Sequence, residues 1–363
     1  MIERTLSERL HLDVPLLSGL ALLCAMGLVI LYSAGGQDTG VVLRQGVRML
    51  GAFGLLFLAA QLPPAKLARW SAGIYVLGIL LLAVVLLFGD VGRGAQRWLD
   101  LGILRFQPSE LMKLAVPMVL AWLLAEGGVP PSFGRVCLSC VLIILPVALI
   151  ARQPDLGTAL LVACAGFAVL FVGGLNLRAI LGFLLLGGVA MPVLWHFLHD
   201  YQRLRVLMFL DPQQDPLGAG YHIIQSQIAI GSGGIYGKGW LNGTQSHLEF
   251  LPERSTDFIF AVYCEEFGLM GAMLLICLYA FIISRGLYIA LNSQHTFGRL
   301  LGAGIVMTFF VYIVVNMGMV SGQVPVVGIP LPLVSLGGTS LVTLMIGFGL
   351  LMAIHTHRRF LAE

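Results

Sequence analysis

The chain alternates between long apolar runs and short polar connections. The runs are about 18–22 residues long and show no strict alternation of apolar and polar positions, so they predict membrane-spanning helices rather than barrel strands. Ten spans are predicted, over residues 14–34, 46–62, 70–89, 108–125, 136–152, 157–174, 177–198, 257–289, 298–320 and 338–355. Because backbone groups in hydrocarbon must bond internally, the pattern predicts an all-α polytopic membrane protein with a single domain over residues 1–363.

Composition agrees with this pattern. Hydrophobic residues make up 58% of the chain and charged residues 11%, with a mean hydropathy of +0.93, whereas soluble domains carry about 25% charged residues. The net charge of +3 says little about partners, and no nucleic-acid partner is expected. The six cysteines lie in or beside apolar runs, which favours packing over a metal site, so no metal-ligating residues are predicted.

Ten spans place both termini on one side of the membrane. Of the 21 Lys and Arg residues, ten fall on each side and Lys113 lies within a span, so the count of cations gives no orientation. The basic ends favour cytoplasmic termini. The many cations left on the outer side suggest an anionic ligand there.

The longest polar segment is an extracytoplasmic loop of about residues 200–256, between the seventh and eighth spans. Its Gly-rich part contains Lys238 but lacks the Walker pattern, which disfavours nucleotide binding and leaves either a ligand-binding backbone or a plain turn cluster. Glu253, a candidate substrate ligand, and Asp257 follow, four residues apart. Loop acids are usually just solvated, but Asp257 opens a span, as a helix N-terminal acid or as a reactive carboxylate.

A second group of polar residues precedes the fourth span. The segment from Arg93 to Phe106 predicts an interfacial stretch that lies on the membrane, in which Arg97 is either an interface anchor or a pyrophosphate ligand. Glu110 and Lys113 lie on one helix face at i and i+3. Charges within the bilayer are costly, so these two side chains should pair, as a structural ion pair or with Lys113 also reaching a substrate phosphate.

Two connections between spans carry prolines. Arg152 and Asp155 flank Pro154, which predicts a tight turn held by a local ion pair. The segment 316–340 contains three prolines and cannot be a straight helix, so a re-entrant or partly extended segment shielded by protein is expected.

Several motifs together resemble one known family. They are RGAQRWLDLG with FQPSELMK, QPDLGT, GYHIIQSQIAIGSGG with GKGW, FLPERSTDFIFA with EEFG, and GMVSGQVPVVGIPLPLVSLGG. In this order they cover nearly the whole chain and resemble the SEDS family of shape, elongation, division and sporulation proteins, above all its elongation branch.

The resemblance implies a peptidoglycan glycosyltransferase that polymerises lipid II at the outer face of the bacterial inner membrane during lateral wall elongation. It implies a class B penicillin-binding protein (a transpeptidase) as partner, alongside other membrane proteins of the elongation complex. The catalytic aspartate of the family corresponds to Asp257, and its intramembrane acid and lysine correspond to Glu110 and Lys113.

This chemistry suits the residues. The attacking sugar hydroxyl needs a base, for which Asp257 is the candidate. The departing diphosphate needs positive charge, for which Arg97, Lys113 and Lys238 are candidates, with a divalent cation possible and no other cofactor assigned. Two other functions stay open: a lipid II flippase, suggested by the intramembrane Glu110–Lys113 pair, and a non-enzymatic scaffold of the elongation complex.

Overall fold

A computed structural model describes most of the chain. It covers residues 10–92, 95–100, 105–175, 200–215, 220–247, 250–251 and 253–357, with isolated residues between 181 and 196. The seventh predicted span, 177–198, lies largely outside the described residues.

The described chain is nearly all-helical and confirms the class of polytopic membrane protein. Eight of its helices are long and apolar enough to cross a membrane, and a ninth, α7, is shorter. They are α2 (Val14–Ala34), α3 (Thr39–Ala60), α4 (Pro64–Phe88), α5 (Pro108–Gly127), α6 (Phe133–Arg152), α7 (Leu156–Val172), α12 (Ile259–Leu291), α13 (Thr296–Val320) and α14 (Thr339–Thr356). These nine coincide with nine predicted spans, and the count of ten stays a prediction.

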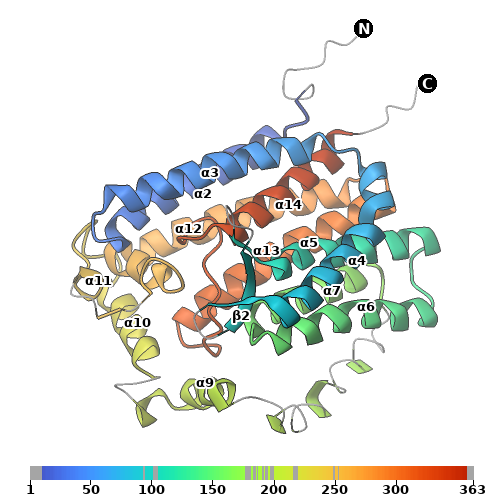
Figure 1. Cartoon of the computed structure of the whole chain (residues 1–363). Coiled ribbons are helices and arrows are strands. Elements are labelled where there is room, and N and C mark those ends of the chain that lie inside the picture. Colours follow the sequence, from blue (N-terminus) through green and yellow to red (C-terminus); the bar gives the residue numbers. More distant parts are fainter. Residues whose placement is uncertain are drawn as a thin grey trace.

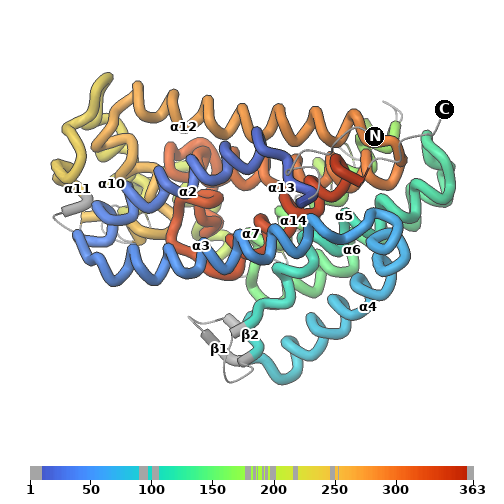
Figure 2. The backbone as a smooth tube through the Cα atoms, turned by 90° about the horizontal axis from the view of Figure 1, so that it is seen from above, coloured from blue at the N-terminus to red at the C-terminus, as the bar shows by residue number. Residues whose placement is uncertain are grey.

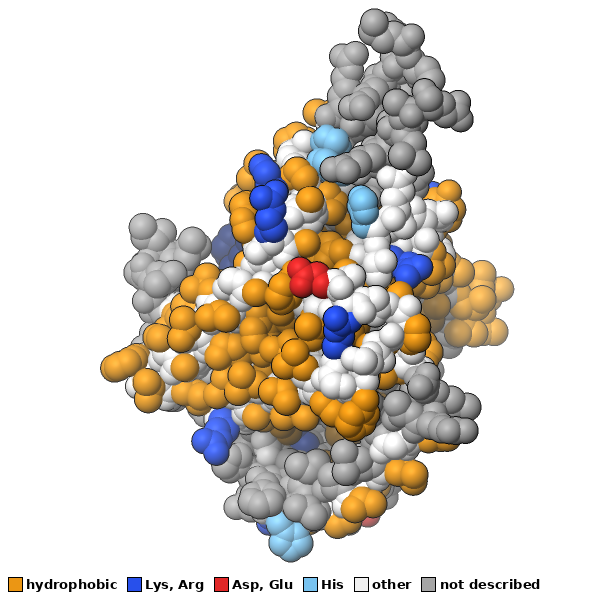
Figure 3. Space-filling view, turned by 90° about the vertical axis from the view of Figure 1, so that its right-hand side faces the viewer, with side chains coloured by type: hydrophobic (Ala, Val, Ile, Leu, Met, Phe, Trp, Pro, Cys, Tyr) orange, Lys and Arg blue, Asp and Glu red, His pale blue; other side chains and the backbone are white. Residues whose placement is uncertain are grey.

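The helices form one bundle with two different ends. Both termini lie at the same end, and the α2–α3 turn, the α10 and α11 helices and the start of α12 lie at the other (Figures 1 and 2). Seen from the terminal side, the surface is largely apolar, with charged side chains scattered singly over it (Figure 3). The end away from the termini is called here the distal end.

A small sheet lies before α5, in the segment that was predicted to lie at the membrane interface. Strands β1 (Asp90–Gly92), β2 (Ala95–Asp100) and β3 (Arg105–Phe106) form an antiparallel sheet in the order β1-β2-β3. The β2–β3 register pairs Leu99 with Phe106. Pairing of the strands satisfies the backbone hydrogen bonds of this segment. The sheet is the one exception to the helical class among the described residues.

The predicted loop 200–256 is largely helical where it is described. It contains α9 (Asp200–Leu210), the short 3₁₀ helix η1 (Pro212–Gln214), α10 (Tyr221–Ser232) and α11 (Thr244–His247). Part of α10 packs on α12 and α13, so this segment belongs to the folded bundle rather than to a solvated loop.

The eighth predicted span, α12, is not a continuous helix. Gly268 interrupts it at φ 64° and ψ −161°, a conformation that is open only to glycine. The neighbouring backbone also requires glycine, since a Cβ at Gly268 would lie 2.3 Å from the amide nitrogen of Gly237. The loop after α10 therefore packs directly into the break in α12.

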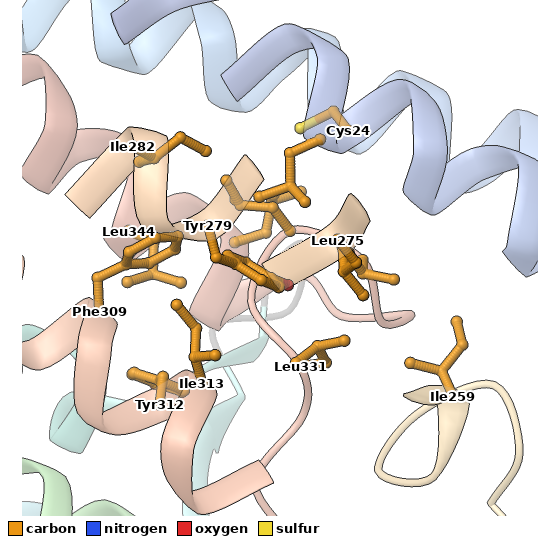
Figure 4. Close-up of a cluster of buried hydrophobic side chains, with 14 of the residues drawn as sticks. Cys24, Ile259, Leu275, Tyr279, Ile282, Phe309, Tyr312, Ile313, Leu331 and Leu344 are labelled. Carbon is orange, nitrogen blue, oxygen red and sulfur yellow. The ribbon is translucent and has the colours of Figure 1, made fainter. Parts of the chain in front are cut away.

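The proline-rich connection between α13 and α14 is irregular, and residues 331–335 within it are buried, which confirms the prediction of a partly extended segment. Tyr279 of α12 is fully buried and donates a hydrogen bond of 2.7 Å to the carbonyl of Pro332. Its ring lies 5.7 Å from that of Phe309 of α13, in a cluster that also contains Leu331 (Figure 4). This cluster holds the proline-rich connection in place against α12 and α13.

Candidate active site

Asp257 lies in a tight turn at the distal end, directly before α12. The amides of Thr256 and Phe258 both donate to the carbonyl of Glu253, at 3.0 and 3.3 Å. The hydroxyl of Thr256 donates to the Glu253 carboxylate at 2.8 Å. Glu253 is exposed and has a left-handed backbone, with φ 52°. The predicted substrate ligand Glu253 therefore shapes the turn that presents Asp257.

The backbone of this turn is held by two other segments. The side-chain amide of Asn316 on α13 donates to the carbonyls of Asp257 and Ile329, at 2.9 and 2.7 Å. The amide of Leu336 donates to the carbonyl of Ser255 at 2.8 Å. Asn316 is fully buried, so the donor of its two bonds is shielded from water. The position of Asp257 is thus fixed by α13 and by the proline-rich connection.

The Asp257 carboxylate lies beside Gly328 of that connection. Gly328 has φ +73°, and a Cβ at this residue would lie 3.4 Å from an Asp257 carboxylate oxygen. Asp257 itself is half-buried. A carboxylate that is partly exposed and held at its backbone is suited to accept a proton from a bound substrate.

The predicted pair Glu110–Lys113 forms within the bundle. The Lys113 ammonium lies 2.6 Å from a Glu110 carboxylate oxygen, and both side chains are almost fully buried. Lys113 also donates to the hydroxyl of Tyr312 on α13 and lies 4.9 Å from the centre of its ring. Tyr312 and Asn316 are one helical turn apart, so a single turn of α13 contacts both Lys113 and the backbone of Asp257.

Arg97 on β2 joins the turn between α6 and α7. Its guanidinium donates to the carbonyl of Gln153 at 3.2 Å and to that of Pro154, and lies 3.8 Å from the Asp155 carboxylate. Asp155 also accepts a bond of 2.9 Å from the Gln107 side chain. The expected local ion pair in this turn is therefore wrong: Asp155 pairs with Arg97, because the sheet brings Arg97 to it.

The start of α7 also packs against the segment beside Asp257. A Cβ at Gly157 would lie 3.0 Å from the carbonyl of Val327 and from the side chain of Ile329. These two residues flank Gly328, which faces Asp257. Arg97 and Asp257 are thus placed at the same end of the bundle and are connected through α7 and the proline-rich connection.

Lys238 is held by α12 in a separate cluster. Its ammonium lies 2.7 Å from a carboxylate oxygen of Glu265 and donates to the Thr244 hydroxyl at 2.8 Å. The same Glu265 oxygen accepts from the hydroxyl of Thr244 and from the amide of Gln245, at 3.1 and 3.0 Å. Glu265 is fully buried, whereas Lys238 is about a quarter exposed. Glu265 was not predicted, although an acid within an apolar run was the signal that identified Glu110.

His222 of α10 is another residue that sequence reasoning missed. Its ring stacks on Phe258 at a centroid distance of 5.8 Å, and its buried Nδ1 atom has no hydrogen-bond partner among the described residues. Burial lowers the pKa of His222, and the nearby charge of Glu253 opposes this shift. No spacing signal marks this histidine, because its contact with the Asp257 turn is made only by the packing of α10.

The structure therefore defines a polytopic membrane protein with a polar site at one end of its helical bundle. Residues 14–360 match the model of the cell cycle protein family FtsW/RodA/SpoVE, and the chain belongs to this family.

Relatives and solved structures agree. The peptidoglycan glycosyltransferase MrdB of Escherichia coli K12 is 52% identical over 99% of this chain and 98% of its own length. MrdB of Helicobacter pylori (strain ATCC 700392 / 26695) is 42% identical over 85% of this chain and 81% of its own.

A chain of a solved peptidoglycan synthase complex, described as coordinating polymerization and crosslinking, is 36% identical with a TM-score of 0.84. The match covers 96% of this chain and 98% of that chain. The rod shape determining protein RodA of Thermus thermophilus is 31% identical with a TM-score of 0.73, over 96% of this chain and 97% of its own.

Proposed function

We propose that this protein, a peptidoglycan glycosyltransferase, polymerises lipid II during wall elongation, with the Asp257 carboxylate as its general base. The single observation that carries the proposal is the placement of Asp257. Its backbone is held by the buried Asn316, while its half-buried carboxylate lies at the distal end of the bundle.

The reaction joins two lipid-linked sugars. A hydroxyl of the acceptor attacks the anomeric carbon of the donor, its proton passes to Asp257, and the bond from that carbon to the diphosphate oxygen breaks. The leaving group departs as a polyprenyl diphosphate with the bonding electron pair. A positioned base of this kind contributes about 10²–10⁴-fold to the rate.

The departing diphosphate needs cations, and the three predicted ones are positioned differently. Lys113 is buried in a pair with Glu110, Arg97 is anchored to the α6–α7 turn, and Lys238 is paired with Glu265. Arg97 keeps about a third of its side chain exposed, which favours it as the diphosphate ligand of the three. Lys113 then acts through Tyr312 and α13 on the Asp257 turn.

A divalent cation fits this chain only as a partner of the substrate. Within the described ranges, no three His, Cys, Asp or Glu side chains converge to hold a metal. Its ligands would therefore include diphosphate oxygens, where it would supply further positive charge.

Partner and location follow from the same proposal. A class B penicillin-binding protein would crosslink the new strand, since a similar chain occurs in a complex that coordinates polymerization and crosslinking. The termini would lie in the cytoplasm and Asp257 at the outer face of the inner membrane, where lipid II presents its sugars.

The test is glycan synthesis from lipid II by purified protein in liposomes. We expect Asp257→Asn to lower the rate by about 10²–10⁴-fold, with thermal stability and partner binding retained. Asp211→Asn, at an exposed acid that caps η1, is the matched control and should leave the rate unchanged. Near wild-type synthesis by Asp257→Asn would remove Asp257 as the base.

A flipping assay on the same liposomes separates the second candidate function. The buried Glu110–Lys113 pair is the observation that favours a flippase, because ionisable pairs in membranes often belong to transport pathways. Transbilayer movement of labelled lipid II that survives Asp257→Asn, without synthesis by the wild type, would favour the flippase.

A further inference from the structure

A hollow at the distal end lies between α2, α3 and the loop after α10. Its volume is about 580 Å³, and its walls are mostly apolar. The residues that form them include Leu28, Val29, Tyr32, Val42, Leu43 and Trp240. We call this hollow the Trp240 groove. It is separate from the residues that position Asp257.

One wall of the groove is rigidly built. The indole of Trp240 donates to the carbonyl of Val29 at 3.3 Å, and its ring lies 6.0 Å from that of Tyr32. The two residues before Trp240 are fixed to α12: the amide of Lys238 donates to the carbonyl of Glu265, and the amide of Gly239 to that of Glu266, at 3.0 and 2.9 Å.

The ion pair between Lys238 and the buried Glu265 holds the same loop to α12 a second time. A side chain on a surface that merely faces lipid needs no such support. The Trp240 wall is therefore a preformed feature of the fold rather than a loop that lies loosely on the membrane.

Cationic side chains lie at the mouth of the groove. The guanidinium of Arg44 lies 3.2 Å from where a Cβ of Gly40, a lining residue, would stand, and it is well exposed. It also lies 3.8 Å from the exposed carboxylate of Asp38, which offsets part of its charge. The guanidinium of Arg254 lies 3.6 Å from the corresponding position at Gly36, in the α2–α3 turn. An amphiphile with an apolar tail and an anionic head matches this arrangement.

The groove also leads to the Asp257 turn. The hydroxyl of Ser255 donates to the carbonyl of Ala34, the last residue of α2, at 3.1 Å. Ser255 and Arg254 are two and three residues before Asp257. A tail in the groove would thus place its head group at the turn that carries Asp257.

We propose that the Trp240 groove binds the polyprenyl tail of a lipid-linked sugar substrate, with Arg44 and Arg254 beside its diphosphate. This inference rests on the proposed function. A phospholipid acyl chain is the competing occupant, and the experiment separates the two.

The first test fills the groove. Leu43→Trp places a large ring in it, and Leu145→Trp makes the same change on α6, at another exposed apolar residue outside the groove. With full-length lipid II, we expect Leu43→Trp to raise KM about tenfold and to leave kcat unchanged, as loss of uniform tail binding should. Leu145→Trp should match the wild type.

The second test changes the length of the substrate's prenyl tail. With an analogue that carries a short prenyl tail, wild type and Leu43→Trp should have the same KM, since the tail no longer fills the groove. Equal KM values for Leu43→Trp and Leu145→Trp on full-length lipid II, with an active wild type, would overturn the groove proposal alone. An inactive wild type would instead count against the proposed function.

Crosslinking identifies the occupant without requiring turnover. A photoreactive amino acid at residue 43 should label lipid II, and polyprenyl diphosphate should compete with the labelling. Phosphatidylglycerol vesicles at the same lipid concentration should not. Equal competition by phosphatidylglycerol would show a general lipid contact and would overturn the proposal.

Discussion

The side-chain amide of Asn316 donates to the backbone carbonyl of Asp257 at 2.9 Å, from a position on α13 that is fully buried. One turn earlier on the same helix, the Tyr312 hydroxyl accepts a hydrogen bond from Lys113. The proposed base and the intramembrane lysine are therefore coupled through one turn of α13, rather than through direct contact between their side chains.

The Asn316 amide should matter for the rate more than for binding. We expect Asn316→Ala to lower kcat about tenfold, since the Asp257 turn would lose the donor that fixes its position and the proposed base would be misplaced, while KM for lipid II stays near the wild-type value. Asn292→Ala removes a similar hydrogen bond at an exposed helix end, where the side-chain amide of Asn292 donates to the carbonyl of Tyr288. This variant should leave kcat unchanged. A kcat for Asn316→Ala equal to that of Asn292→Ala would contradict this role.

The Glu110–Lys113 pair should act as a unit. Neutralising one partner leaves a buried charge unpaired, so Glu110→Gln or Lys113→Met should destabilise the fold by about 3–5 kcal/mol. The double variant should recover part of that loss, as measured by thermal unfolding in detergent. Glu126→Gln, at the far end of α5, is the control. Additive losses in the double variant would argue against a coupled pair.

Gly328 offers a test of the contact with Asp257. Gly328→Ala and Gly128→Ala both place a side chain at positive φ, which destabilises the fold. Only at Gly328 does the new Cβ come into contact with the Asp257 carboxylate, whereas Gly128 has open space around it. Both variants should lose stability, and only Gly328→Ala should lower the rate of glycan synthesis. Equal activities of the two variants would show that the carboxylate tolerates the added group.

His222 should make stability depend on pH. Burial lowers its pKa in the folded protein, so on acidification below about pH 6.5, the ordinary value, the unfolded chain binds a proton before the folded chain does. Folded stability is therefore lost as the pH falls through this window. His222→Gln should remove that part of the loss. Glu253→Gln should enlarge it, because the Glu253 charge raises the pKa. Melting temperatures of the three proteins across this range provide the measurement, and identical slopes would refute the assignment.

The sequence identified those residues whose role can be inferred from their immediate neighbours in the chain. An acid and a lysine within apolar sequence predict a buried pair, and Glu110 and Lys113 form one. Three prolines predict a broken segment, which the α13–α14 connection confirms. Arg97 and Lys238 were identified as candidates, but Asp155 was expected to pair with Arg152 and Glu265 was not identified. The observed contacts join different segments of the chain, so local spacing does not reveal them.

Hydrophobic pattern and motif order by themselves determined that this protein is a helical membrane protein of its family, with Asp257 before a span. Helix length and lipid exposure depend on local composition, so a single sequence is enough for them. Only the tertiary structure decided that Asn316 holds the Asp257 turn, that the break at Gly268 receives the loop carrying Lys238, and that Trp240 closes a groove. Each of these depends on which backbones approach one another, and that is set by packing between distant segments.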